Sequence, residues 1–230
     1  HGVVSTSANE VGLNLHSESI PTDASYGLNG WKNYHLCTLT LEGNIAAVRP
    51  FTMGSTLVMR LVAKIPYAAH SAPNMVTQAV TYFNFGDTRT GIHFWYGVAI
   101  YDNRGYQHAV SPSGHQISYD AGTASPNVLS TLGVASPFIQ TLSGTFTSQT
   151  WSEYRVVSYM IQPAHLVNAV REIKKKYPNE ARLQQMSEDA SSYILGHANV
   201  NPEIFSPNPM DKKLFAHMGM TVKEFSYYVQ

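Results

Sequence analysis

The chain has 230 residues, and its 15 basic and 15 acidic residues leave no formal net charge at pH 7. Nucleic acids and anionic membranes bind through basic surfaces, so we expect neither as the main partner. No apolar run approaches the roughly 20 residues that a membrane-spanning helix requires, so we expect no membrane insertion. The length fits one all-β domain, and we predict a single domain over residues 1–230.

The beginning of the chain predicts an extended arm. Residues 1–26 are rich in Ser, Asn and Thr, and only Val11–Leu15 has a weak strand pattern. We expect this arm to lie along the edge of a sheet. The chain starts at His1, as a processed protein would, which favours a secreted or cell-surface location. The lone Cys37 can form no intrachain disulfide.

Short runs rich in β-branched and aromatic residues recur along the chain, and Gly, Pro and Asn separate them. They predict strands at Tyr34–Leu41, Asn44–Pro50, Thr56–Ile65, Met75–Phe85, Gly91–Asp102, Tyr106–Val110, Gln116–Tyr119, Val128–Leu132, Phe138–Leu142, Trp151–Gln162, Tyr193–Asn201 and Lys213–Val229. Such short, regularly spaced strands are typical of all-β folds. We predict an antiparallel β-sandwich.

One segment has the periodicity of a helix instead. Pro163 can begin a helix without losing a hydrogen bond, and apolar residues recur on one face of the turns that follow. Lys174–Lys176 complement the helix dipole at the carboxyl end, so we expect them to face solvent rather than to bind an acidic ligand. Leu183–Ala190 predicts a second short helix. One or two helices are therefore expected between Pro163 and Ala190.

The stretch Gly91–Asp102 predicts a ligand surface, because strand side chains point alternately to the two faces of a sheet. One face is apolar and is expected in the core: Ile92, Phe94, Tyr96, Val98 and Ile100. The other face places polar-tipped aromatic residues beside residues too small to fill space: His93, Trp95, Gly97, Ala99 and Tyr101. A groove that holds a ligand would be lined in this way.

Neighbouring strands would extend this surface if they present their outward faces together. The candidate ligand-binding residues are Arg60, Tyr82, Asn84, His93, Trp95, Tyr101, Tyr193, His197 and Asn199. Sugars have apolar C–H faces and hydroxyl edges, which aromatic rings and Asn, Arg and His side chains complement. A slip of one residue in strand register would turn each face over, and the aromatic residues would then pack under the helix and loops.

The same residues admit catalysis. Elimination in a uronic-acid polysaccharide needs a base for the C5 proton, an acid for the leaving oxygen and an amide or Arg for the carboxylate. The candidates for base and acid are His93, Tyr82 and Tyr101, and those for the third role are Asn84 and Arg60. Hydrolysis is less favoured, because it uses two facing carboxylates and acidic residues are scarce on the predicted strands.

Metal ligation has two candidate sites, and we expect no required cofactor. Asp87, Asp102 and Asn103 lie in turns, where their oxygens could bind Ca²⁺ or stabilise the loop. His1 could bind copper through its amino and ring nitrogens. The start His1-Gly2 resembles the mature start of lytic polysaccharide monooxygenases, although the resemblance covers two residues only. Copper is therefore the weaker alternative.

Three stretches together resemble the concanavalin A-like jelly rolls of lectins, laminin-G-like domains and several polysaccharide lyases. They are Thr56–Ile65, the central HFWYGVAIYDNRG and Met220–Val229. The resemblance implies a carbohydrate-active β-sandwich. The sheet motifs of alginate lyases and the Glu-x-Asp-x-x-Glu pattern of laminarinase-like hydrolases are absent from the sequence. Their absence favours binding over catalysis.

We therefore predict an extracellular protein that binds a glycan or polysaccharide. If the protein is an enzyme, the alternative is a polysaccharide lyase. A third hypothesis is a structural jelly roll of a capsid or appendage, in which the aromatic face would be a contact between protomers.

Overall fold

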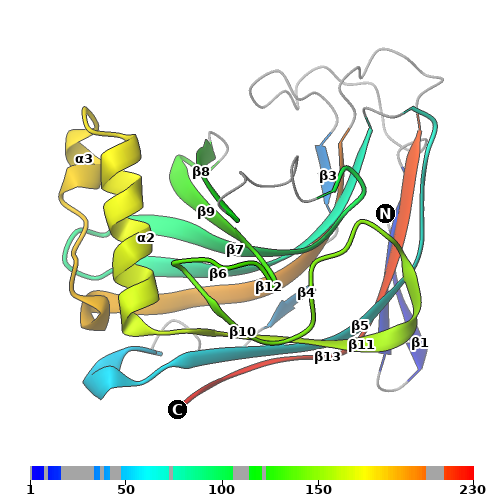
Figure 1. Ribbon diagram of the computed structural model, residues 1–230, viewed down its shortest axis with the longest axis horizontal. Helices are drawn as coiled ribbons and strands as arrows, with labels where there is room; N and C mark the ends of the chain where they lie inside the picture. Colours follow the sequence, from blue (N-terminus) through cyan, green and yellow to red (C-terminus); the bar gives the residue numbers. More distant parts are fainter. Residues whose placement is uncertain are drawn as a thin grey trace.

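The structure is a computed structural model. It describes residues 2–7, 10–16, 34–36, 39–41, 48–72, 75–105, 114–120, 123–205 and 215–230. Most of these residues are in strands, which form two sheets packed face to face around an apolar core (Figure 1). The predicted all-β sandwich of the jelly-roll type is therefore confirmed.

The first sheet has six strands in the order β1-β2-β13-β5-β11-β10, and all neighbours are antiparallel. Its strands are β1 (Gly2–Ser7), β2 (Glu10–His16), β13 (Ala216–Val229), β5 (Leu57–His70), β11 (Trp151–Ile161) and β10 (Gln140–Ser143). β1 and β2 lie within the predicted arm and form a hairpin at the edge of this sheet. β13 lies between β2 and β5.

The second sheet has seven strands, and the order of its main path is β3-β12-β6-β7-β9-β8. Its strands are β3 (Tyr34–Leu36), β4 (Leu39–Leu41), β12 (Tyr193–Phe205), β6 (Val76–Asp87), β7 (His93–Asp102), β9 (Ser125–Thr131) and β8 (His115–Asp120). β4 pairs with β12 beside β3. β7 and β9 are parallel, whereas the other pairs are antiparallel. The parallel pair departs from the predicted antiparallel pattern because β8 intervenes in the chain and pairs on the far side of β9.

Aromatic side chains of β6 and β7 fill the centre of the core. Phe85 packs against Tyr96 with ring centroids 5.7 Å apart and against Phe94 at 5.8 Å. The side chains of Gly91–Asp102 that the alternation assigns to the core are all buried: Ile92, Phe94, Tyr96, Val98 and Ile100. Burial of one such side chain stabilises the fold by roughly 1.5–3 kcal/mol. These contacts therefore outweigh any single polar contact at the surface.

The predicted helix is α2 (Pro163–Lys176), which stands beside the short α3 (Ala181–Gln184) at one end of the sandwich (Figure 1). It buries Leu166, Ala169, Val170 and Ile173 along one face. Lys174–Lys176 lie in its last turn, as predicted, and Lys174 contacts Glu188 at 3.1 Å. α3 begins and ends earlier than the predicted second helix, and a 3-10 turn, η4 (Ala190–Ser192), precedes β12.

Some predicted strands differ from the observed ones. Residues 48–50 of the predicted strand Asn44–Pro50 are not in a strand, and a 3-10 turn, η3 (Thr52–Gly54), follows them. The rest of that prediction, and the predicted hairpin strand Tyr106–Val110, lie outside the described residues. β12 continues to Phe205, beyond the predicted end at Asn201. This extension places further polar residues on the face of the second sheet.

Candidate functional site

The face of the second sheet that points away from the core brings together most of the predicted ligand-binding residues. We call the following group the outer-face cluster: Tyr82, Asn84, His93, Trp95, His197 and Asn199. Asn84 is paired with Trp95 on β7 and with His197 on β12, and Tyr82 is paired with Asn199. Adjacent strands in this register place side chains of one face within contact distance.

Direct contacts hold the outer-face cluster together. The ring of Trp95 lies 5.1 Å from that of His197 and 6.0 Å from that of Tyr82, which meets it edge-on at 79°. His93 Nδ1 lies 3.1 Å from Asn84 Oδ1, and Trp95 donates from Nε1 to Thr123 Oγ1 at 3.2 Å. His93 is exposed, whereas Trp95, Tyr82 and His197 are half-buried. The cluster therefore presents aromatic surface with polar edges to solvent.

The surroundings shift the pKa values of two rings of the cluster, Tyr82 and His197, towards their uncharged forms. Burial raises the pKa of Tyr82 well above its ordinary value, and the negative charges of Glu203 and Asp120 raise it further. A hydrogen bond with Asn127 lowers the pKa but does not offset these effects. Burial lowers the pKa of His197, and the nearby His93 lowers it again. At neutral pH the phenol is protonated and the His197 imidazole is neutral. Both can hydrogen-bond to a neutral ligand.

Asn201 and Glu203 lie further along the same face, and the sequence interpretation did not assign them to it. Glu203 is 1% exposed and accepts a hydrogen bond from Gln78 Nε2 to Oε2 at 2.5 Å. The side-chain oxygens Oδ1 of Asn199 and Asn201 are buried and have no hydrogen-bond partner among the described residues. The alternation of His197, Asn199, Asn201 and Glu203 along β12 is the signal that could have identified them.

Two small residues on this face are covered by neighbouring side chains. A Cβ at Gly97 would lie 2.6 Å from Cε1 of Tyr82 and 2.9 Å from Cδ1 of Leu129. Ala99 is buried in a small apolar group with Val80 and Leu129. The expected open space beside Gly97 and Ala99 is therefore filled, because the Tyr82 ring lies over the glycine.

Tyr101 and Tyr193 are not on the outer face, and the prediction that they line the groove is wrong. Register shifts occur at Ile100 in β7, between the pairs Tyr101–Ala79 and Ala99–Val80, and at Gly196 in β12. The extra residue of such a bulge reverses which side chains face the core. Tyr101 is 2% exposed and lies 6.2 Å from the ring of Trp151, and Tyr193 is 1% exposed and donates to the carbonyl of Ser187.

The prediction that Arg60 lines the same groove is also wrong. Arg60 belongs to β5, in the first sheet, and its Nε lies 3.0 Å from Glu224 Oε1. The outer-face cluster belongs to the second sheet, and the core separates the two outward faces. Alternation along a strand predicts on which face a residue lies, but it does not identify the sheet to which the strand belongs.

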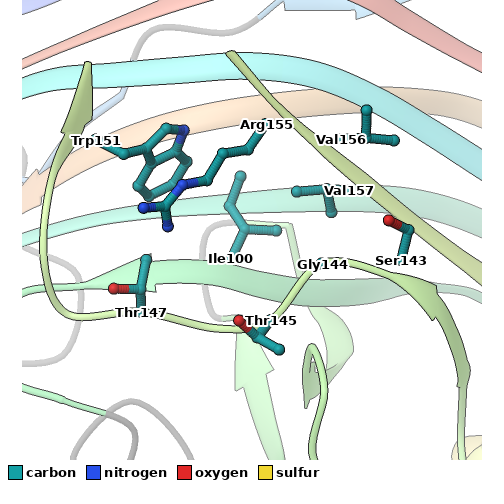
Figure 2. A pocket seen from close by; sticks show the side chains of 9 residues that line it. All are labelled: Ile100, Ser143, Gly144, Thr145, Thr147, Trp151, Arg155, Val156 and Val157. Carbon is teal, nitrogen blue, oxygen red and sulfur yellow. The ribbon is translucent and has the colours of Figure 1, made fainter. Parts of the chain in front are cut away.

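A pocket lies apart from the outer-face cluster, beside the segment that joins β10 to β11 (Figure 2). Its volume is about 400 Å³. The residues that line it come from β7, from the end of β10, from this segment and from β11: Ile100, Ser143, Gly144, Thr145, Thr147, Trp151, Arg155, Val156 and Val157. None of the predicted site residues lines it.

The predicted Ca²⁺ ligands do not form one site. Asp87 ends β6 and Asp102 ends β7, at opposite ends of the antiparallel pair. Asp102 accepts hydrogen bonds from Arg104, and Asn103 accepts one from the backbone N–H of Thr77 at 2.8 Å. His1 lies outside the described residues. Among the residues that the structure describes, no group of three or more His, Cys, Asp or Glu side chains could hold a metal ion.

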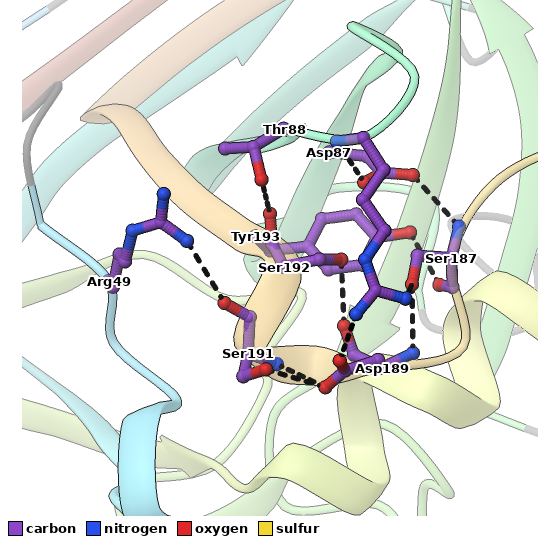
Figure 3. Close-up of polar contacts among 9 residues, drawn as sticks. Arg49, Asp87, Thr88, Ser187, Asp189, Ser191, Ser192 and Tyr193 are labelled. Atoms are coloured by element: carbon purple, nitrogen blue, oxygen red, sulfur yellow. Dashed lines mark hydrogen bonds and ion pairs between the residues drawn. The ribbon is translucent and has the colours of Figure 1, made fainter.

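Asp87 instead connects the β6–β7 turn to the segment between α3 and β12 (Figure 3). Its carboxylate accepts from the N–H of Arg89 at 3.0 Å, from Thr90 Oγ1 at 2.9 Å and from the N–H of Ser187 at 2.8 Å. Arg89 extends the network by pairing with Asp189. All the bonds of this carboxylate are structural, as the turn position predicts.

No protein-family model matches the chain, and no curated protein matches it either. It is similar to the solved structure of the family 11 xylanase from Neocallimastix patriciarum, with 11% identity and a TM-score of 0.47, over 99% of this chain and 85% of that one. It is also similar to the family 12 xyloglucanase from Bacillus licheniformis in complex with ligand, with 8% identity and a TM-score of 0.46, over 99% and 84%. Within the described residues, no helix has the length and apolar character needed to cross a membrane.

The prediction that the protein is a polysaccharide lyase, if it is an enzyme, is wrong. Tyr101, one of the residues proposed as base or acid, is buried in the core, so it cannot act together with His93 on a substrate at the outer face. The pKa of Tyr82, the other proposed acid, is raised well above its ordinary value.

Proposed function

We propose that the protein binds a carbohydrate polymer on the outward face of the second sheet. The observation that carries the proposal is the half-buried Trp95, which lies between the rings of Tyr82 and His197 with Asn84 beside it. An aromatic ring stacks on the apolar face of a sugar, and amides and imidazoles beside it bind the hydroxyl groups. A secreted or cell-surface location, where such polymers occur, belongs to this proposal.

The electrostatic character of the face favours a neutral glycan. The Tyr82 phenol and the His197 imidazole are uncharged at neutral pH, and no Lys or Arg belongs to the outer-face cluster. The face therefore offers stacking and hydrogen bonds rather than ion pairs.

Affinity electrophoresis against a panel of neutral and acidic polysaccharides tests the proposal. We expect at least one neutral polymer to retard the protein, and we expect Trp95→Ala to abolish the retardation, since loss of the stacked ring removes roughly 1–3 kcal/mol of binding energy. Trp95→Phe should retain part of it.

The control is Tyr228→Ala, which removes an exposed aromatic ring from the first sheet and should leave the retardation unchanged. If no polysaccharide in the panel retards the protein, or if Trp95→Ala is retarded as strongly as the wild type, the outer face is not a glycan site.

A further inference from the structure

The pocket beside β11 contains one cation without an anionic partner. Arg155 is exposed, and it forms no ion pair or hydrogen bond with the described residues. Its guanidinium lies over the ring of Trp151 at 5.1 Å from the centroid. Figure 2 shows it between Trp151 and Thr147, directed into the pocket. Its N–H groups are therefore available to a ligand.

Trp151 holds the guanidinium in a defined position. The indole is 6% exposed and donates from Nε1 to the carbonyl of Ala63 at 3.1 Å, which fixes the ring against β5. An arginine stacked on a fixed ring keeps its planar fork of donors in one orientation. Such a fork binds a carboxylate or sulfate through two parallel hydrogen bonds.

The other residues of the pocket fit a sugar ring. Ile100 and Val157, both nearly fully buried, form its apolar base together with Trp151. Ser143 and Thr145 contribute hydroxyl groups to its wall, whereas the Thr147 hydroxyl is bonded to the backbone of Gln149. A pyranose has one apolar face and a hydroxyl edge, which this arrangement complements.

Backbone hydrogen bonds preform the hydroxyl side of the pocket. Thr147 donates its N–H to the carbonyl of Ile100 at 3.3 Å and accepts from the N–H of Asp102 at 3.2 Å. Phe146 donates to the carbonyl of Leu132 at 3.0 Å. A Cβ at Gly144 would lie 3.0 Å from the carbonyl of Val156, so this segment lies directly against β11. A ligand would therefore not have to order it.

We propose that this pocket binds one acidic sugar unit, with the carboxylate or sulfate group on Arg155, the apolar ring face on Ile100 and Val157, and the hydroxyl groups on Ser143 and Thr145. No residue of the pocket belongs to the outer-face cluster, although Ile100 and Trp95 are both on β7, and the proposal does not rest on the function proposed above. It would bind a charged sugar, whereas the outer face favours a neutral polymer.

Isothermal titration calorimetry with D-glucuronate, D-glucose 6-sulfate, D-glucose and inorganic sulfate tests the proposal on the whole chain. We expect at least one acidic sugar to bind about tenfold more tightly than glucose, because a charge-assisted hydrogen bond contributes more than a neutral one. Whichever of the two acidic sugars binds more tightly identifies carboxylate or sulfate as the group recognised.

Arg155→Gln should remove that tenfold advantage, and Arg155→Lys should retain only part of it because the fork is lost. Arg182→Gln removes the same charge from an exposed arginine outside the pocket and should change nothing. Thr145→Val should weaken binding of the sugars but not of inorganic sulfate.

The proposal is overturned if neither acidic sugar binds more tightly than glucose, if inorganic sulfate alone binds as tightly as the acidic sugars, or if Arg155→Gln leaves their affinity unchanged. Trp95→Ala should not alter these affinities. Failure at this pocket and failure at the outer face are thus separate results.

Discussion

At the scale of single residues, a neighbouring side chain explains why the residue at position 97, Gly97, is a glycine. Its φ is not in the left-handed region, so its backbone conformation is open to alanine. The close approach of Tyr82 to the position of the missing Cβ is what excludes a larger residue. The orientation of Tyr82, and with it the edge that it presents to Trp95, depends on this glycine.

Gly97→Ala is expected to lower the free energy of unfolding by about 1–3 kcal/mol, because the added methyl group forces the Tyr82 ring to move. Urea unfolding of Gly97→Ala, Tyr82→Ala and the double variant measures this. Gly97→Ala should lower the free energy of unfolding much less in the Tyr82→Ala variant than in the wild type. Additive effects in the double variant would mean that the ring does not lie over Gly97.

His197 should make stability depend on pH. Its folded-state pKa is lowered from 6.5, so the unfolded chain takes up the proton more readily than the folded protein does. The contribution of neutral His197 to the free energy of unfolding is therefore fully present above about pH 6.5. It is lost as the pH falls through 6.5 towards the folded-state pKa.

Thermal unfolding between pH 5 and pH 8 checks this expectation. His197→Gln should flatten the fall in Tm on the acid side. His165 should account for part of the remaining dependence, because burial lowers its pKa too. An unchanged acid slope in His197→Gln would contradict the assignment.

At the scale of secondary-structure elements, strand alternation predicted the faces well until a bulge interrupted it. The apolar set that begins at Ile92 and runs to Val98 lies in the core, and the alternating His93 and Trp95 lie on the outer face, as predicted. The irregularity at Ile100 in β7 then turns Tyr101 into the core. The irregularity at Gly196 likewise separates Tyr193 from His197. A bulge depends on how a strand meets its neighbour, which the pattern within one strand does not contain.

The link between the β6–β7 turn and the helical segment depends on Asp87. Asp87→Asn replaces one of the acceptor oxygens of a buried carboxylate by an amide donor. In one orientation this donor faces both Ser187 N–H and Thr90 Oγ1, and in the other it faces the N–H of Arg89. We expect a loss of about 1–3 kcal/mol in the free energy of unfolding. Urea unfolding measures it.

Asp189→Asn is the matched control, because Asp189 belongs to the same network but is exposed at the surface. It should cost clearly less than Asp87→Asn, because solvent screens the ion pair of Asp189 with Arg89. Equal effects of the two substitutions would mean that Asp87 has no special role in joining the segments.

At the scale of the whole molecule, the sequence predicted the two-sheet fold because regular spacing of short strands has few other solutions. It did not predict which strands share a sheet. Arg60 and Trp95 both point outward, yet they lie on opposite surfaces of the sandwich. The packing of β11 near β7 in the folded sandwich is what brings Arg155 and Trp151 close to the segment at Thr147. No local sequence motif therefore marks their pocket.

The position of β13 has a consequence for how the protein folds. Residues 216–229 separate β2 from β5, strands that precede them in the chain by well over a hundred residues. Until the ribosome has released this segment, the hydrogen-bonding edges of β2 and β5 have no partner between them, and open edges of this kind recruit other chains. Contacts so distant in sequence also slow folding. The nascent chain should therefore be most prone to aggregate just before its first sheet closes.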